Sequence, residues 1–255
     1  MAMKGEMGYP SALTAKTWGF YDVSFSHTNK DLALKPAGQY ELRLPQALGS
    51  YVMENVLFKI SFPAEFHAQT AVECALQLHP KVAGRLDQVE RIVIQTQEAG
   101  TRIIDKTGPL HNYADRDHCL QYMVAVPLVF GRLTAEDYSD AVAADPRIDA
   151  LREKMEVSEN PGFTRDYFDP EKRYIGNSVE VYFKDGSSTG KVSIDTPLGH
   201  RDRRGEGIPA LLAKFEAAMA GQLPAKRVGQ LLELTGDTSR FEATPIHRFM
   251  DLFTP

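Results

Sequence analysis

Residues 178–195 read SVEVYFKDGSSTGKVSID, and this stretch decides the expected fold class. Two runs of alternating apolar and polar residues, 178–184 and 190–195, flank the dipeptide Asp185-Gly186. Alternation on both sides of an Asp-Gly turn predicts a β-hairpin, here with a loop longer than two residues. A second alternating run, RIVIQTQ at 91–97, is rich in β-branched residues and predicts another strand.

Helical patterns lie between these strands and after them. Apolar residues at helical spacing, together with Pro, Gly and N-cap signals, predict helices at 67–78, 115–130, 209–220 and 226–234, and shorter ones after Thr134 and Asp145. Pro80 and Gly131 are expected to end the first two, and Pro127 to kink the second. Because helices and strands mix without regular βαβ alternation, we expect an α+β fold with a small mixed sheet and a separate block of C-terminal helices.

Composition and charge exclude several classes of protein, among them nucleic-acid-binding and membrane-spanning proteins. The 255 residues carry a formal net charge of −5 with acidic and basic residues interspersed, so the basic stripe typical of a nucleic-acid binder is absent. No run of apolar residues is long enough for a membrane helix, and the opening MAMKGEMGYP lacks the apolar core of a signal peptide. Two cysteines, Cys74 and Cys119, are typical of a reduced, cytoplasmic protein. We therefore expect no nucleic-acid partner and no membrane partner.

Several long, ordered runs carry a resemblance to known proteins. They are KGEMGYPSALTA (4–15), WGFYDVSF (18–25), GSYVMENVLFKISFPAEFHAQTAVE (49–73), RIIDKTGPLHNYADRDHCLQYMVAVPL (102–128), FGRL (130–133), DPRIDALREKM (145–155) and IPALLAKF (208–215) after Gly199-His200. These runs resemble the MmgE/PrpD family, most closely the branch that dehydrates 2-methylcitrate. The similarity covers nearly the whole chain and departs from the family pattern at Lys16-Thr17 and over 26–48.

The resemblance implies a domain organisation. Members of the family have an all-helical domain, a smaller α+β lid domain and a C-terminal return into the helical domain. By analogy, residues 1–45 are expected to end the helical domain and form a linker, 46–200 to form the lid, and 201–255 to form the helical return. Most of the helical domain is then missing from this sequence. In relatives it is expected to supply an Asp and histidines to a site in the cleft between the two domains.

The resemblance also implies an activity. It is the dehydration of 2-methylcitrate to 2-methyl-cis-aconitate in propionate catabolism by the methylcitrate cycle, by a homodimeric or otherwise homo-oligomeric hydro-lyase. Two cysteines are too few for an aconitase-type cluster, so no cofactor is expected. No metal site is expected either, since neither the histidines nor the cysteines show ligand spacing. The alternatives are an incomplete fragment, a binding subunit that pairs with the missing helical domain, or a related activity such as citrate or aconitate hydratase or cis-aconitate decarboxylase.

The first candidate cluster lies in KISFPAEFH at 59–67. A tricarboxylate substrate calls for fixed cations and hydrogen-bond donors that stabilise the charge developing in the transition state. Lys59 precedes a Pro and a helix start, and the resemblance makes it a catalytic candidate. His67 and Gln69 are expected to bind substrate. The alternatives are a lysine whose ammonium extends to solvent and a histidine that caps or packs.

The second cluster is YADRDHCLQY at 113–122. His118 and Tyr122 are four residues apart, so on a helix both would face one cleft. A tyrosine hydroxyl can protonate a leaving group, and Arg116 can bind a carboxylate with two hydrogen bonds. The resemblance favours Tyr122 and His118 as catalytic and Arg116 as substrate-binding. The alternatives are a solvated helix start at 115–117 and a Tyr122 that packs in the core.

The third cluster is the basic loop HRDRR at 200–204. A loop of this charge before a helix could bind an anion, but a run of charges is more often a solvated face or an interface. No residue of this loop is therefore among the candidates.

Overall fold

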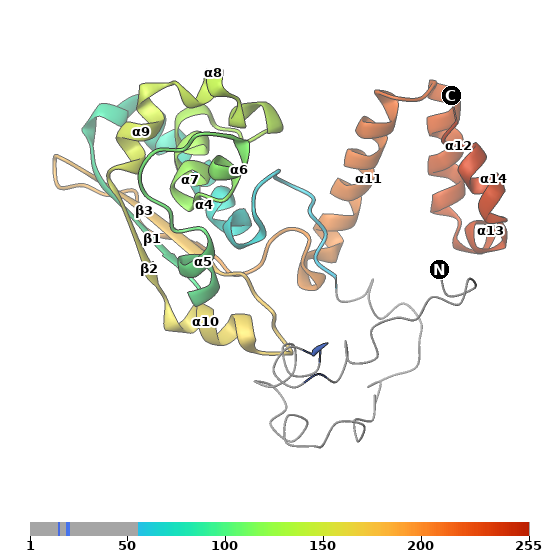
Figure 1. The fold of residues 1–255 in the computed structure, drawn as a ribbon, viewed down its shortest axis with the longest axis horizontal. Helices are drawn as coiled ribbons and strands as arrows, with labels where there is room; N and C mark the ends of the chain where they lie inside the picture. Colours follow the sequence, from blue (N-terminus) through green and yellow to red (C-terminus); the bar gives the residue numbers. More distant parts are fainter. Residues whose placement is uncertain (1–14, 16–18, 21–55, 255) are drawn as a thin grey trace. The chain divides into compact units, whose positions relative to one another are not determined.

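The computed structural model describes residues 15, 19–20 and 56–254 (Figure 1). The chain divides into two compact units, residues 1–51 and 52–255. In the first unit, the backbone N–H of Gly19 donates to the carbonyl of Ala15 at 2.7 Å. The expectations for 1–45 and 26–48 concern residues outside the described part of the chain, apart from these few positions.

The second unit mixes helices and strands, which confirms the α+β class (Figure 1). Its strands are β1 (Val89–Thr96), β2 (Met155–Glu159), β3 (Asn177–Phe183) and β4 (Val192–Ile194). Its α-helices are α4 (Gln69–Val82), α5 (Glu98–Ile103), α6 (Tyr113–Asp117), α7 (Leu120–Phe130), α8 (Asp140–Ala143), α9 (Pro146–Arg152), α10 (Pro161–Phe168), α11 (Arg204–Ala220), α12 (Ala225–Gly236), α13 (Thr238–Ala243) and α14 (Ile246–Asp251). Short 3₁₀ helices are η2 (Phe66–Ala68), η3 (Ala83–Gln88), η4 (Ala135–Tyr138) and η5 (Arg201–Arg203).

The four strands form one mixed sheet in the order β2-β1-β3-β4. β1 runs parallel to β2 and antiparallel to β3, and β3 forms the expected hairpin with β4. The register pairs Ile92 with Val181 and Ile94 with Val179, all four fully buried. Neighbouring positions on the opposite face hold polar residues, such as the paired Arg91 and Tyr182, so only one face carries the core.

Helices cover that apolar face of the sheet (Figure 1). α4 packs against β3 and β4, α9 against β1, and α7 packs against both helices. The strongly apolar α7 is buried along almost its whole length because α4 and α9 enclose it. Gly131 ends α7 with a left-handed backbone, φ 67°, as its position after the apolar run predicts.

Three helix predictions were wrong in their bounds. The helix expected over 209–220 already begins at Arg204 and contains Pro209. α4 continues through Pro80 to the fully buried Val82, because a proline in the last turn removes only one helical hydrogen bond. The helix expected over 115–130 is broken: α6 ends at Asp117 and α7 begins at Leu120. The N–H of Leu120 donates to the carbonyl of Ile104 at 2.7 Å, so it cannot continue the ladder of α6.

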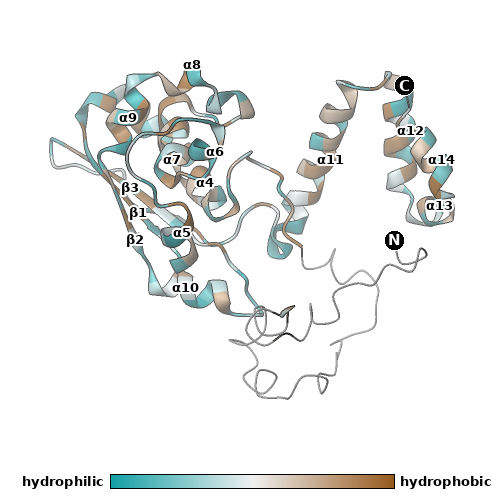
Figure 2. Ribbon diagram, viewed as in Figure 1, coloured by the Kyte–Doolittle hydropathy of each residue, from teal (hydrophilic) through white to brown (hydrophobic). Residues whose placement is uncertain are grey.

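The C-terminal helices have a hydrophobic cluster of their own, centred on Leu223, Val228 and Leu231. Large apolar side chains of these helices are exposed: Ile208, Leu212, Phe241, Ile246 and Met250. The ribbon of α11 and α14 carries brown, hydrophobic segments in Figure 2. Within the described ranges, no helix combines the length and apolar character needed to cross a membrane.

Candidate functional site

The six candidate residues divide into a buried set and a set near the surface. Tyr122, Arg116 and Gln69 are almost completely buried. The side chains of His67 and His118 are 14% and 54% exposed, and Lys59 is exposed. The structure therefore does not bring all six to one surface.

Tyr122 lies in the core beside α9 and η4. Its hydroxyl donates to the carbonyl of Asp137 at 2.6 Å, and its ring stacks on Tyr138 with 5.9 Å between centroids. Burial raises the pKa of Tyr122 to about 12. His118, by contrast, occupies the break between α6 and α7 and is exposed, so the two side chains do not share the face expected of a continuous helix.

Arg116 and Gln69 make hydrogen bonds that hold backbone segments. Arg116 donates to the carbonyl of Tyr138 and to the carboxylate of Asp140, both at 2.6 Å. The Gln69 amide donates to the carbonyls of Phe62 and Ala64, at 2.9 and 2.8 Å. These contacts tie the segment before η2 to the start of α4, so Gln69 supports the loop that carries the surface candidates.

A hydrogen-bonded cluster surrounds His67. One carboxylate oxygen of Glu65 accepts from the His67 backbone N–H at 2.7 Å, and the other lies 2.8 Å from ring atom Nδ1. On the opposite side of the ring, Nε2 lies 3.2 Å from the hydroxyl of Tyr167 in α10. A carboxylate, an imidazole and a phenol are thus aligned near the surface, and all three can take part in proton transfer.

Hydrogen bonds and charges within this cluster stabilise the ionised form of the Glu65 carboxyl group. Burial alone would raise the pKa of the Glu65 carboxyl, but hydrogen bonds from His67 and the charges of His67 and His118 outweigh it and hold the pKa below its usual value. Burial, followed by the negative charge of Glu65, raises the pKa of Tyr167. Glu65 is therefore a carboxylate and Tyr167 a phenol near neutral pH.

Lys59 and His118 flank the cluster. The ammonium of Lys59 lies 5.5 Å from the ring centroid of Phe66, which separates Glu65 from His67 in the sequence. The backbone carbonyl of Lys59 accepts from Lys214 in α11 at 2.6 Å, which anchors the segment. His118 contacts Asp117 at 2.7 Å and acts electrostatically on Glu65. Three of the six candidates, Lys59, His67 and His118, are thus in one neighbourhood.

Sequence reasoning missed Glu65 and Tyr167. An acidic residue two positions before a histidine at a helix start is a signal that could have identified Glu65, because such a residue can cap the helix and reach the ring. Tyr167 lies 100 residues from His67, in a helix that no pattern had predicted, so the sequence carried no comparable signal for it.

The basic loop 200–204 is occupied by internal contacts. Both guanidinium nitrogens of Arg203 pair with Glu73 of α4, at 2.9 and 3.0 Å, and this pairing raises the pKa of Arg203. His200 is buried: Nε2 donates to the carbonyl of Lys172 at 2.8 Å, and Nδ1 accepts from the N–H of Asp202 at 3.2 Å. The loop therefore fastens α11 to the α+β core.

The buried His200 makes stability depend on pH. Burial lowers its pKa below the usual 6.5, so the folded state favours the neutral ring. Its contribution is complete above the unfolded pKa and is lost as pH falls through the folded value, by at most about 1.4 kcal/mol per pH unit. We expect denaturant melts between pH 7.5 and 5 to show a steeper loss of stability for wild type than for His200→Gln. The exposed His247→Gln serves as control, and equal slopes for all three proteins would contradict the prediction.

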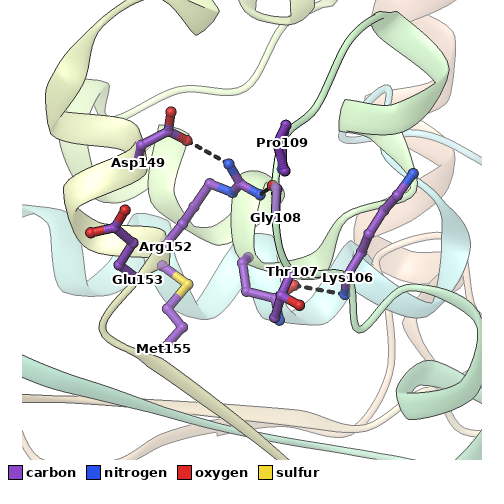
Figure 3. Close-up of a pocket in the computed structure, with 9 residues that line it drawn as sticks. Lys106, Thr107, Gly108, Pro109, Asp149, Arg152, Glu153 and Met155 are labelled. Carbon is purple, nitrogen blue, oxygen red and sulfur yellow. Dashed lines mark hydrogen bonds and ion pairs between the residues drawn. The ribbon is translucent and has the colours of Figure 1, made fainter.

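A cavity of about 540 Å³ lies elsewhere, between residues 106–109 and the end of α9 (Figure 3). Its principal cation, Arg152, is held by Asp149 at 2.5 Å and by the carbonyl of Gly108 at 2.9 Å. None of the six candidates lines it. Because the charge of Arg152 is already compensated by Asp149, we place the candidate site at Glu65, His67 and Tyr167 instead.

Among the described residues, no group of three or more His, Cys, Asp or Glu side chains is arranged to hold a metal ion.

Several known proteins are similar to this chain over nearly its whole length. The family model of the MmgE/PrpD C-terminal domain matches residues 62–237. A 2-methylcitrate dehydratase of Salmonella typhimurium is 56% identical over 256 residues, which cover 99% of this chain and 50% of the relative. One from Escherichia coli K12 is 53% identical with the same coverage. A mitochondrial one from Yarrowia lipolytica is 56% identical over 235 residues, 91% of this chain and 43% of the relative. The chain thus spans about half the length of these relatives.

Proposed function

Because this chain belongs to the MmgE/PrpD family, we propose that it forms the C-terminal-domain side of a 2-methylcitrate dehydratase site. The observation that carries the proposal is the hydrogen-bonded cluster of Glu65, His67 and Tyr167, flanked by Lys59 and His118. The cluster lies within or beside the sequence matched by the family model and belongs to a chain more than half identical to several dehydratases.

The reaction defines what such a site must do. A proton leaves the carbon next to a carboxylate, the C–H electrons form the double bond, and the hydroxyl departs with the C–O electrons and one proton, as water. The negative substrate becomes more negative at the reacting carbon before the hydroxyl leaves. Fixed cations and donors must compensate this charge, and a positioned acid must protonate the hydroxyl.

The residues of the candidate cluster can supply a cation for a substrate carboxylate and groups that exchange protons. The Lys59 ammonium is exposed and its backbone is anchored, so it can bind a carboxylate of the substrate. His118, which acts electrostatically on Glu65, can supply a further donor, and His67 with Tyr167 offers exchangeable protons. We keep Tyr122, Arg116 and Gln69 as proposed contributors that act from beneath the surface, by fixing η4 and the segment that leads to His67.

The wider assignment rests on the family resemblance of the sequence. We propose a homodimer in the cytoplasm that acts in the methylcitrate cycle without a cofactor, with domain limits at 1–45, 46–200 and 201–255. In this proposal, the exposed apolar side chains of α11, α13 and α14 pack on the helical domain that the family resemblance implies. The half-length match favours one alternative, an incomplete or binding subunit. The other alternative is citrate, aconitate or cis-aconitate chemistry in the same cluster.

The first test is turnover of 2-methylcitrate with and without a chelator, followed by the ultraviolet absorbance of the unsaturated acid. The chain is assayed alone and with the half of the Salmonella relative that it does not match. We expect activity in the mixture and a fall of about 100-fold in kcat/KM for Lys59→Ala, because one fixed charge at the substrate is lost. The exposed Lys81, which donates to the carbonyl of Thr189, provides the matched Lys81→Ala control.

Each result has a defined meaning. Activity of the chain alone would show that its residues contain a complete site. Activity only in the mixture would show that the chain supplies one side. Absence of activity both in the chain alone and in the mixture would count against the proposed function. Equal activity of Lys59→Ala and Lys81→Ala would count against the role of Lys59. Loss of activity on chelation would overturn the expectation of a metal-free reaction.

A further inference from the structure

We propose that Glu65, His67 and Tyr167 form a proton relay in which Tyr167 exchanges a proton with the substrate and Glu65 positions the imidazole. This inference rests on the proposed function and assigns roles to two residues, Glu65 and Tyr167, beyond the six candidates. It is carried by an unbroken line of contacts, from carboxylate to Nδ1 at 2.8 Å and from Nε2 to the phenol oxygen at 3.2 Å.

Glu65 determines which ring nitrogen of His67 carries hydrogen. An ionised carboxylate can only accept hydrogen bonds, so Nδ1 must be the protonated nitrogen in the neutral ring. The second carboxylate oxygen accepts from the backbone N–H of the same histidine at 2.7 Å, which prevents the carboxylate from rotating away. Nε2 is then left free of hydrogen in the neutral ring and can accept the proton of the Tyr167 hydroxyl.

The backbone of His67 is fixed from beneath. The fully buried Asn177, at the start of β3, donates to the His67 carbonyl at 2.8 Å and to the Thr70 hydroxyl at 2.7 Å. Thr70 in turn donates to the carbonyl of Ile175 at 2.7 Å. The imidazole is therefore held by side chains on both sides and by the sheet below, as a residue with a defined geometric task requires.

Tyr167 is the member of the relay that comes from a distant part of the chain, helix α10. It lies near the end of α10, its ring is half-buried and contacts Phe168 edge-on with 5.2 Å between centroids. Its ring also lies 5.6 Å from the His67 ring. The phenol stays protonated near neutral pH, for the reasons given above, so it has a proton to donate and an imidazole behind it to replace that proton.

The relay transfers one proton to the departing hydroxyl of the substrate. When His67 holds a second proton, the Glu65 carboxylate compensates the positive charge. As the substrate C–O bond breaks, its electrons leave with the hydroxyl oxygen, which takes the Tyr167 proton and becomes water. The Nε2 proton passes to the phenol oxygen, so Tyr167 is restored and His67 becomes neutral. The proton lost from the substrate carbon, taken by the base of the site, replaces the one that His67 gave.

The tautomer of His67 tests the relay without requiring turnover. We expect ¹⁵N chemical shifts of the neutral imidazole, recorded on this chain, to show Nδ1 protonated and Nε2 without hydrogen. In Glu65→Gln the amide has one acceptor oxygen for two donors, so the Nδ1–H population should fall. A wild-type ring protonated mainly at Nε2 would overturn the relay, whatever the activity of the protein.

Turnover in the two-chain mixture tests the role of Tyr167. We expect Tyr167→Phe to lower kcat by about 100-fold with KM changed by less than about threefold, as for loss of an acid–base group that does not bind the ground state. Glu65→Gln should lower kcat by at least about tenfold through the wrong tautomer. The matched control is Tyr182→Phe, which removes a phenol that donates a hydrogen bond to Glu180 on the far face of the sheet.

Failure of this inference differs from failure of the proposed function. A mixture without dehydratase activity counts against the dehydratase, and the relay is then decided by the tautomer alone. An active mixture in which Tyr167→Phe matches Tyr182→Phe counts against the relay and leaves the dehydratase standing.

Discussion

Gly199→Ala is expected to lower turnover in the two-chain mixture by about 100-fold, because a displacement of about 1 Å near a reacting group can cost that much. A Cβ at Gly199 would lie 1.7 Å from the carbonyl oxygen of Phe58, far inside any real contact. The two backbones are joined there, with the Phe58 N–H donating to the Gly199 carbonyl at 3.2 Å. The backbone at Phe58 must therefore move away from residue 199. Lys59 follows Phe58 directly in the chain, so its ammonium is expected to move as well.

The control for this substitution is Gly205→Ala. Gly205 lies in the first turn of α11, and a Cβ there meets nothing within 4 Å. Alanine at this position should leave turnover unchanged and stabilise the helix by up to about 1 kcal/mol. Circular dichroism and denaturant melts separate a local displacement from loss of the fold. Equal turnover for Gly199→Ala and Gly205→Ala would show that the contact with Phe58 does not position Lys59.

Tyr122→Ala is expected to destabilise the chain by about 3–5 kcal/mol, because it removes a fully buried aromatic ring from the core. Tyr122→Phe keeps the ring and its stacking on Tyr138 but leaves the Asp137 carbonyl without this donor. That change should cost about 1 kcal/mol. Both values are measured as free energies of unfolding from denaturant melts monitored by fluorescence or circular dichroism.

The Tyr122→Phe variant also separates the two interpretations of this residue. If Tyr122 acts only through packing, turnover of folded Tyr122→Phe stays within a few-fold of wild type. A much larger loss of turnover, with stability nearly unchanged, would assign the Tyr122 hydroxyl a direct catalytic role and would require η4 to open so that substrate can reach it. Phe183→Leu, in the same core but remote from the candidate cluster, provides a stability control.

Local patterns were sufficient for much of the fold. The β3–β4 hairpin follows from alternation around Asp185-Gly186, and α9 from the Asp145-Pro146 start, where the Asp145 side chain caps the helix. Thr134 and Asp137 form the capping box that the predicted Thr cap suggested. Such signals are short-range, so neighbouring residues suffice to specify them. The break between α6 and α7 depends on the Ile104 carbonyl, 16 residues from Leu120, and no local pattern could predict it.

The sequence by itself determined the α+β class, the family and the two segments around Lys59 and His118, because periodicity and long matching runs are properties of the chain alone. Only the tertiary structure decided which polar side chains of those segments face solvent. Burial places Tyr122, Arg116 and Gln69 where their hydrogen bonds hold the backbone. The Glu65–His67–Tyr167 cluster exists because folding brings α10 beside η2, across 100 residues of chain, and a contact between distant residues leaves no periodicity in the sequence.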